Sequence, residues 1–495
     1  MMRQESARFG KRWLGLLVTV GLTIVLLVWT WLSVQAGNVP VEVGLPSPTG
    51  KLDTALSLTL TYSESTTATV YMPMVMRDHR PPPSVFGVQM TTIDNAGGLA
   101  QAVEADVHWV RFHGFRWDEI EPVRANPPRY DWTHVDEQSL RNAPANGMDV
   151  VGIVHATPPW AQKYPGSSCG PIEADALDEF AQFLTALVNR YGAPPYNVRH
   201  WELGNEPDAP INFEQSVYGC WGDGNEDDFG GRYYARMLQV AYPAIKAVDP
   251  QAQVFIGGLL LDCDPANAPV GKDCRPGNFL EGILAGGGGP YFDVVSYHAY
   301  TYYAGALGQM TNPNWPGSVT AVPEKTAFLR GVLERYGYGD KAIMNTEAAM
   351  LCSNPTDECL ETQAIYVPRA YAEALALGLK GHVYYAMINE PWRYTGLLLP
   401  DLTPKKVYYA YHTAATFLTR VTYQGPVGGY PAGIEGYAFR QKDTLRRVDV
   451  VWSANGSAQS LTLPAGTSAY DRYGSLVASS GVIQVDYGPV YVVTP

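Results

Sequence analysis

The sequence has no segment rich in Lys or Arg, and its 35 basic residues are outnumbered by 48 acidic ones, giving a formal net charge of −13. A protein that binds nucleic acid needs clustered positive charge to neutralise phosphates. We therefore exclude nucleic acid as a partner. Charged residues of both signs make up only 17% of the chain, whereas apolar residues make up 46%, which is enough for a large buried core.

Metal-binding patterns are also missing. The six cysteines form no CxxC pair and no cluster with His, which excludes the common zinc patterns. The segment "WGDGNEDDFGG" (221–231) places Asp223, Asn225 and Asp227 at alternate positions, as a calcium-binding loop does. It lacks the Gly at position six and the Glu at position twelve of such a loop. We therefore expect a solvated loop here, and we predict no metal site.

The N-terminus carries the topological signal of the chain. Four basic residues in "MMRQESARFGKR" precede 22 residues without a charge, "WLGLLVTVGLTIVLLVWTWLSV" (13–34). This run is longer than the usual signal-peptide core of about 7–15 residues and would cross a bilayer of about 30 Å. The small residues of "VQA" (34–36) would also suit signal cleavage. Residues 1–37 are therefore predicted to be either a signal peptide or a membrane anchor, and the remainder to be extracellular or at the cell surface.

The cysteines agree with export. All six lie in the middle of the chain, in segments rich in Gly, Pro, Asp and Asn. An even number of loop cysteines in an exported protein indicates disulfides, although six cysteines allow fifteen pairings. The short spacings favour Cys263–Cys274 and Cys352–Cys359, which leaves Cys169 with Cys220.

Eight short apolar segments recur at intervals of roughly 40 residues and alternate with segments of helical periodicity. The expected strands are 85–90, 107–112, 149–156, 198–205, 253–260, 292–300, 341–347 and 381–387. The clearest helices are 176–192, 230–250 and 362–378. This number of units over about 300 residues predicts an α/β fold, a (β/α)8 TIM barrel. The alternative is a doubly wound open sheet, but no glycine-rich phosphate loop follows the first strand.

Two regions flank the expected barrel at 84–423. Residues 38–83 are rich in Ser, Thr, Val and Pro and are predicted to be a linker or stalk, with one or two strands in it. Residues 424–495 contain short alternating segments separated by turns, such as "GIEGYAFRQ" and "RRVDVVWSA". This pattern predicts a small antiparallel β-sandwich domain.

Functional side chains of a TIM barrel gather at the carboxyl ends of its strands. The expected ends of strands four and seven each supply a carboxylate, Glu206 in "WELGNEPD" and Glu347 in "IMNTE". Cleavage of a glycosidic bond needs two carboxyl groups that flank it, one protonated and one ionised. Other polar or aromatic residues at strand ends are Arg111, His155, Asn205, His298, Tyr300 and Trp392.

These motifs resemble the clan A retaining β-glycoside hydrolases, and among them most closely the family 39-type β-xylosidases and their relatives. The resemblance covers about 85–392 and, more loosely, the sandwich. It implies Glu206 as general acid/base and Glu347 as nucleophile, with no metal or organic cofactor. It also implies that Asn205 binds the sugar 2-hydroxyl. Supporting roles at the nucleophile fall to Arg111, His298 and Tyr300, and Trp392 would form the floor of the −1 subsite.

Several residues have a structural alternative. Arg111 could hold a buried carboxylate such as Glu202, and His155 could be a rim histidine rather than a substrate-binding one. Five aromatic residues near the catalytic end could stack on sugars or simply pack in loops: Trp160, Trp221, Trp315, Tyr302 and Tyr303.

A second Asn-Glu-Pro, at 389–391, follows strand eight. The partner geometry would be wrong there, so we expect Glu390 to be at most a subsite contact. The sequence thus predicts a retaining glycosidase acting on an oligo- or polysaccharide. The alternatives are a transglycosidase with the same residues and a non-catalytic carbohydrate-binding protein on a TIM barrel.

Overall fold

The computed structural model describes residues 41–43, 55–62, 66–73, 84–211, 219–388 and 392–495. The predicted signal peptide or anchor at 1–37, with its apolar run 13–34, and the Glu390 position lie outside the described residues. Within the described ranges, no helix is both long and apolar enough to cross a membrane.

The chain forms two compact units, Met1–Arg80 and Pro81–Pro495. The first unit contains a three-stranded antiparallel sheet in the order β1-β2-β3. Its strands are β1 (Val41–Val43), β2 (Ala55–Tyr62) and β3 (Thr66–Pro73). The segment expected to be a linker with one or two strands therefore contains three.

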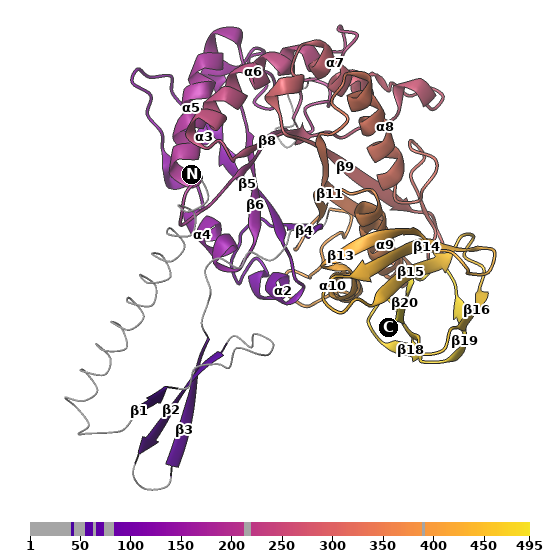
Figure 1. Cartoon of the computed structure of the whole chain (residues 1–495). Coiled ribbons are helices and arrows are strands. Elements are labelled where there is room, and N and C mark those ends of the chain that lie inside the picture. The colour runs from indigo at the N-terminus through magenta and orange to yellow at the C-terminus, as the bar shows by residue number, and fades with distance from the viewer. Residues whose placement is uncertain (1–40, 44–54, 63–65, 74–83, 212–218, 389–391) are drawn as a thin grey trace, which may run out of the picture. The chain divides into compact units, whose positions relative to one another are not determined.

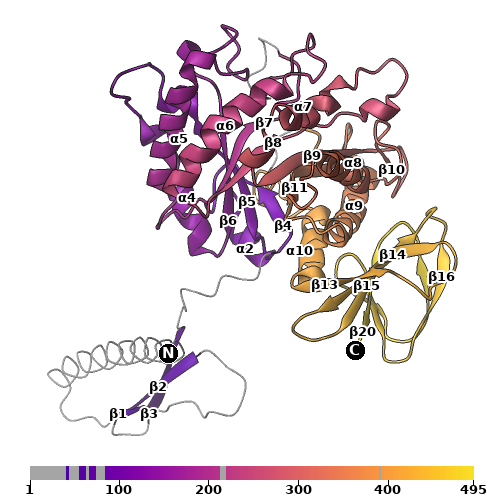
Figure 2. The same ribbon diagram turned by 45° about the horizontal axis from the view of Figure 1, so that its top comes forward.

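The second unit begins with a closed barrel of eight parallel strands, which confirms the predicted fold class. Helices surround the strands on the outside (Figures 1 and 2). In chain order the barrel strands are β4 (Phe86–Gln89), β5 (Trp109–Arg116), β6 (Asp149–His155), β7 (His200–Asn205), β8 (Gln253–Gly258), β9 (Val294–Tyr303), β11 (Ala342–Leu351) and β12 (His382–Tyr384). Each overlaps one of the eight expected segments. The short strand β10 (Met310–Thr311) extends β9 as an antiparallel hairpin.

Each helix of the unit follows one of these strands in the chain. They are α2 (Leu99–Glu104), α3 (Trp117–Ile120), α4 (Glu137–Ala145), α5 (Leu177–Tyr191), α6 (Gly231–Val248), α7 (Phe279–Ala285), α8 (Val322–Arg335), α9 (Asp357–Ala376) and α10 (Lys406–Leu418). Helix α9 begins five residues before the expected start at 362, because Thr356 caps it by accepting a hydrogen bond from the Cys359 amide at 3.2 Å.

The inside of the barrel is apolar at one level and polar at the next. Trp109, Val151, Phe255, Val294, Met344 and Val383 form one closed apolar cluster. Two residues further along their strands, Arg111 and Ser296 occupy the same inward face, because successive side chains of a strand alternate between faces. The polar level begins there and leads to the carboxyl ends of the strands.

The C-terminal strands form the predicted antiparallel sandwich, drawn in yellow in Figure 1. One sheet has the order β13-β14-β15-β20-β17-β18, and β16 pairs with β19. The strands are β13 (Val421–Pro426), β14 (Ile434–Gln441), β15 (Arg447–Ser453), β16 (Gln459–Leu463), β17 (Ser468–Tyr470), β18 (Leu476–Ala478), β19 (Gly481–Val485) and β20 (Val490–Thr494). Alternating residues such as Leu461, Leu463, Ile483 and Val485 fill the core between the two sheets.

Three disulfides connect the six cysteines in the predicted pairing, Cys169–Cys220, Cys263–Cys274 and Cys352–Cys359. All three lie in segments that follow barrel strands at their carboxyl ends. The first joins the segment after β6 to the segment after β7. The other two close short loops after β8 and β11.

Glu361 on α9 connects the barrel to the sandwich. It accepts hydrogen bonds from Lys406 Nζ on α10 at 2.7 Å, Arg472 Nε at 3.0 Å and the Tyr473 hydroxyl at 2.5 Å. Burial acts to raise the pKa of this carboxyl, but hydrogen bonds from these three residues outweigh it and lower the pKa to about 2. The ionised form of Glu361 is therefore the form that the folded protein stabilises.

Glu361→Gln should reduce stability at neutral pH, and the difference from wild type should shrink in acid. A depressed folded-state pKa contributes stability above the unfolded value of about 4.3, and this is lost as the pH falls toward 2. Because the group is partly exposed, the expected difference is only about 1 kcal/mol. Thermal unfolding of both proteins between pH 7 and pH 2.5 measures it. A constant difference across that range would contradict the assignment.

Candidate active site

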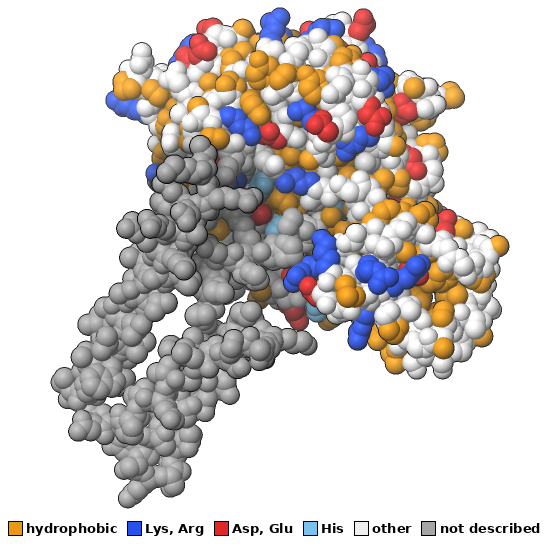
Figure 3. Space-filling view, viewed as in Figure 1, with side chains coloured by type: hydrophobic (Ala, Val, Ile, Leu, Met, Phe, Trp, Pro, Cys, Tyr) orange, Lys and Arg blue, Asp and Glu red, His pale blue; other side chains and the backbone are white. Residues whose placement is uncertain are grey.

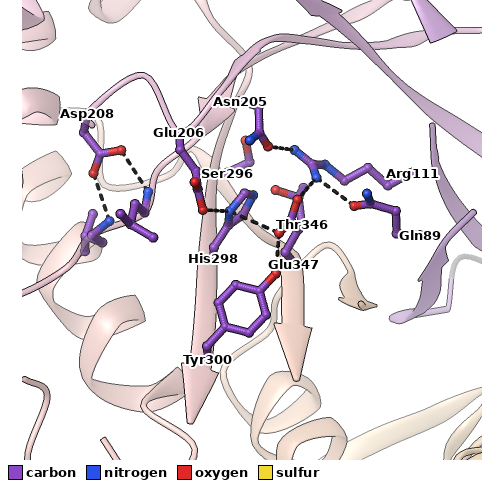
Figure 4. A network of polar contacts seen from close by, with 12 residues as sticks. Gln89, Arg111, Asn205, Glu206, Asp208, Ser296, His298, Tyr300, Thr346 and Glu347 are labelled. Atoms are coloured by element: carbon purple, nitrogen blue, oxygen red, sulfur yellow. Dashed lines mark hydrogen bonds and ion pairs between the residues drawn. The ribbon is translucent and has the colours of Figure 1, made fainter. Parts of the chain in front are cut away.

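Glu206 immediately follows β7, and its backbone departs from the strand at that point. Its φ of 48° lies in the left-handed region, and its amide donates to the Gly258 carbonyl at 2.9 Å. Such a conformation is costly for a residue with a side chain and persists where the surroundings fix it. The Glu206 carboxyl points toward His298, whose Nδ1 lies 2.8 Å from Oε1 (Figure 4).

Glu347 lies on β11, opposite Glu206. A register shift between Asn345 and Glu347 interrupts the alternation of this strand. Thr346 consequently points to Glu202, while the adjacent Glu347 accepts hydrogen bonds from Arg111 Nη1 and the Tyr300 hydroxyl. The two carboxyl groups of Glu206 and Glu347 thus approach each other from strands four and seven of the barrel (Figure 4).

His298 lies between the two carboxyl groups. Its Nδ1 is 3.6 Å from Glu347 Oε2 and closer to Glu206. One atom from each of Glu206, His298 and Glu347 lies within 4.8 Å of the others, so these three are the side chains that could ligate an ion among the described residues. Because the Arg111 guanidinium already contacts Glu347, a second cation at this point would be repelled.

Arg111 is fully buried and has four acceptors. Nε donates to Glu202 at 2.6 Å, Nη2 to Asn205 Oδ1 at 2.7 Å, and Nη1 to Gln89 at 2.9 Å and to Glu347. Glu202 is held in turn by the hydroxyls of Ser296 at 2.7 Å and Thr346 at 2.9 Å. Arg111 therefore does both things considered from the sequence: it pairs a structural carboxylate and contacts Glu347.

The environment separates the protonation of the two carboxyl groups. Burial, Glu347 and Asp208 raise the pKa of Glu206 well above its usual value. Burial also raises the pKa of Glu347, but the Arg111 charge and the hydrogen bonds from Tyr300 and Arg111 oppose that effect. The surroundings therefore favour the protonated form more strongly at Glu206 than at Glu347.

Two further buried groups hold the backbone behind Glu206. Asp208 accepts hydrogen bonds from the amides of Leu260 at 2.8 Å and Leu261 at 2.9 Å. Lys325 donates to the carbonyls of Leu260 at 2.9 Å and His298 at 2.8 Å. Burial lowers the pKa of Lys325 to about 8, against the charges of Asp208, Asp262 and Glu206. The Leu260 peptide is thus held from both sides.

A cavity of about 690 Å³ opens over the two carboxyl groups. Asn205, Tyr300 and Trp392 line it together with Glu206 and Glu347. The Trp392 ring stands edge-on to Tyr300, with centroids 5.4 Å apart and an interplanar angle of 73°. Five of the eight residues proposed from the sequence therefore line this cavity. Two more, Arg111 and His298, contact its carboxyl groups.

His155 does not line this cavity. It lines an adjoining one of about 40 Å³, which shares Asn205 with the first and has Trp117, Phe180 and Trp221 in its wall. Burial and the charges of Arg116 and Arg111 lower its pKa to about 3. Strand β6 ends at His155, so the residue is at the expected height, but its side chain lies outside the cavity over the carboxyl groups.

The cavity residues that were not proposed from the sequence include three with polar side chains, Gln89, His113 and Tyr385. His113 is two residues beyond Arg111, and strand alternation would have placed both on one face. Although the cavity leaves part of its ring accessible, the surrounding protein and the charge of Arg111 lower the pKa of His113 well below its usual value. The expected end of this strand at 112 excluded it, whereas β5 continues to Arg116.

Gly258 leaves the space that His298 occupies. A Cβ at this position would lie 2.2 Å from His298 Nε2 and 2.8 Å from the Thr346 hydroxyl. Gly258→Ala should therefore displace the His298 ring from Glu206 and reduce whatever activity the site has by about 10²-fold, a usual cost for losing an acid/base arrangement. Gly331→Ala is the matched control, since nothing surrounds that position within 4 Å. Equal activity of both variants would show that the His298 contact is dispensable.

Comparisons with known proteins agree with the fold. The sequence matches no protein-family profile and no curated protein. Among solved structures, a family 39 glycoside hydrolase from Bacteroides cellulosilyticus WH2 is similar with a TM-score of 0.64 at 20% identity, over 89% of this chain and 87% of that one. A GH39 β-xylosidase from Caulobacter crescentus has a TM-score of 0.54 at 16% identity, with 84% and 97% covered. A GH30 endoxylanase from Clostridium papyrosolvens C71 has a TM-score of 0.54 at 14% identity, with 84% and 97% covered.

At these identities the similarity concerns the fold. The barrel with its trailing sandwich is the architecture shared with these glycoside hydrolases, and the resemblance predicted from the sequence motifs is confirmed at that level.

Proposed function

We propose that the chain is a retaining β-glycosidase that hydrolyses an oligo- or polysaccharide, with Glu206 as general acid/base and Glu347 as nucleophile. The observation that carries the proposal is the pair of buried carboxyl groups at the ends of strands four and seven. One oxygen of each lies within 4.8 Å of the other and of His298 Nδ1. Retaining enzymes hold their carboxyl groups about 5–5.5 Å apart, whereas inverting enzymes leave about 6.5–9.5 Å for a water molecule.

In the first step Glu347 attacks the anomeric carbon with a carboxylate oxygen. The bond from that carbon to the leaving oxygen breaks, and Glu206 gives its proton to the leaving oxygen. The product of this step is a sugar bound covalently to Glu347. The roles match the environments, because Arg111 favours an ionised Glu347 and burial favours a protonated Glu206.

In the second step Glu206, now ionised, removes a proton from water. The resulting hydroxide attacks the anomeric carbon and Glu347 leaves, so two inversions give net retention. The closeness of His298 Nδ1 to Glu206 Oε1 suits both steps, since a ring nitrogen can hold the carboxyl in one orientation while its proton comes and goes.

The remaining residues orient the sugar. Asn205 accepts from Arg111 through Oδ1, which leaves its amide NH2 to donate to a sugar hydroxyl such as the 2-hydroxyl. Trp392 and Tyr300 offer apolar surface beside the carboxyl groups. His155 lies outside this cavity and has no place in the proposed site.

The three disulfides support a location outside the reducing cytoplasm, so we propose an extracellular or cell-surface protein. Attachment to a membrane through residues 13–34 stays a prediction from the sequence.

The stereochemistry of the first product tests the proposal. The purified protein is incubated with aryl β-glycosides and β-linked polysaccharides of xylose, glucose and galactose, and released sugars are followed by proton NMR. Early appearance of the β-anomer supports retention. An early α-anomer would contradict a nucleophilic Glu347, transfer to sugar acceptors in place of water would indicate a transglycosidase, and binding without turnover would indicate a carbohydrate-binding protein.

A further inference from the structure

Tyr302 is an aromatic residue that lines the cavity. Its side chain makes no hydrogen bond and no aromatic ring contact with the other described residues. It follows His298 and Tyr300 on β9, and alternate residues of a strand share a face. His298 contacts Glu206, Tyr300 contacts Glu347, and Tyr302 comes next along this face toward solvent. Tyr302 lines the cavity and is 41% exposed.

The other aromatic residues considered from the sequence are used in packing. Trp221 and Trp315 are buried, and the indole of Trp160 donates to the Glu121 carbonyl at 3.0 Å. Tyr303 lies on the opposite face of β9, where its hydroxyl donates to Glu358 at 3.0 Å. The structure thus separates Tyr302 from residues of the same type in the same region.

The distance along the strand fits one additional sugar unit. Two residues of a strand span about 6.6–6.8 Å, so the backbone of Tyr302 lies about that far beyond the backbone of Tyr300, whose hydroxyl contacts Glu347. This is comparable to the length of one pyranose unit in a chain. An exposed aromatic face offers flat apolar surface to the C–H face of such a ring.

The charges around the cavity restrict the sugar. Apart from Glu206 and Glu347, the described residues that line the cavity carry no charge, since the pKa of His113 is lowered well below its usual value. Arg111 is fully buried and already contacts four acceptors. Among the described lining residues a sugar carboxylate would therefore meet no cation, and Glu347 would repel it.

We propose that the cavity takes an uncharged oligosaccharide of at least two sugar units. The first unit is the one that Glu347 attacks, and the additional unit next to it stacks on the exposed ring of Tyr302. This inference deepens the proposed function and rests on the same site. Tyr302 is a specificity-determining residue: it contacts the sugar chain and takes no part in the proton transfers.

The test compares substrates with and without a second ring. β-Xylosyl and β-glucosyl fluorides have one sugar ring and no ring in the leaving group. β-Linked xylotriose and glucotriose have two further sugar rings. Tyr302→Ala should lower kcat/KM for the trisaccharides about 10-fold, which corresponds to about 1.4 kcal/mol, and leave the fluorides within about twofold. Tyr302→Phe should keep wild-type values. β-Glucuronosyl fluoride should react at least about 100-fold more slowly than the better neutral fluoride.

Tyr303→Ala is the matched control, because it removes the same side chain from the other face of β9. The inference is overturned if Tyr302→Ala affects fluorides and trisaccharides equally or affects neither, or if the glucuronosyl fluoride reacts as fast as the neutral ones. Failure of the proposed function is distinguishable, because the wild type would then hydrolyse nothing. Calorimetric binding of the trisaccharides to Glu347→Gln, with and without Tyr302→Ala, tests the stacking in that event through the same tenfold change.

Discussion

Replacing Glu347 by Ala should lower kcat by about 10⁴–10⁶-fold, the range seen when a nucleophile is removed from an enzyme whose catalytic residues act as a unit. Without the carboxylate, no atom of the protein can form the covalent intermediate. Arg111 would keep its contacts to Glu202, Asn205 and Gln89, so the barrel should keep its fold. Steady-state hydrolysis of an activated aryl β-glycoside measures the loss.

Azide distinguishes the roles of the two carboxyl groups. In Glu347→Ala a small anion can occupy the vacated space and attack the sugar directly, which gives the α-glycosyl azide. In Glu206→Ala the covalent intermediate still forms on Glu347, and azide then attacks that intermediate, which gives the β-glycosyl azide. Glu334→Ala removes an exposed carboxylate from α8 and should leave activity unchanged. Near-wild-type turnover in Glu347→Ala would refute the nucleophile, and the same azide anomer from both variants would refute the division of roles.

Arg111→Met should cause the second large loss, in both stability and activity. It leaves Glu202 and Glu347 buried without their cation, and breaking a buried ion pair from one side costs about 3–5 kcal/mol. The pKa of Glu347 should rise because Arg111 opposes the effect of burial there. Since attack requires the ionised form, the acid limb of kcat/KM should move to higher pH. Denaturant unfolding and a pH profile on one aryl glycoside give both readouts.

A paired replacement separates the two losses. Arg111→Met with Glu202→Gln removes the second unpaired charge and should recover part of the stability but little activity, because Glu347 still lacks its guanidinium. If the single variant unfolds at the wild-type denaturant concentration, the network of Arg111 is not a structural element. If its pH profile is unchanged, Arg111 does not control the ionisation of Glu347.

The sequence was informative where chemistry and strand periodicity coincide. Each of the eight barrel strands overlaps its expected segment, because buried parallel strands are short continuous apolar runs. Once the strands were in order, their last residues indicated Glu206 and Glu347, since the carboxyl ends of parallel strands meet at one end of a barrel. The pairing of cysteines followed from short loops, and the structure has that pairing.

The direction in which side chains point was harder to predict from the sequence, because it depends on local irregularities of the backbone. Thr346 and Glu347 are adjacent yet both face polar partners, because β11 shifts register between Asn345 and Glu347. His155 closes its strand at the expected height but faces a different cavity. Tyr302 was expected in a loop and lies on a strand, which is what places it on the face of His298 and Tyr300.

The positions of the disulfides have a consequence for engineering. The bonds close stretches with sequence separations of 51, 11 and 7 residues, and each stretch begins after a barrel strand at its carboxyl end. The stretch between Cys263 and Cys274 is a short loop whose two ends are already joined, so its interior can be replaced without the new sequence having to hold the ends together. Residues 264–273 are therefore a suitable site for grafting and randomised libraries, whereas 170–219 contains α5, β7 and Glu206 and must be kept.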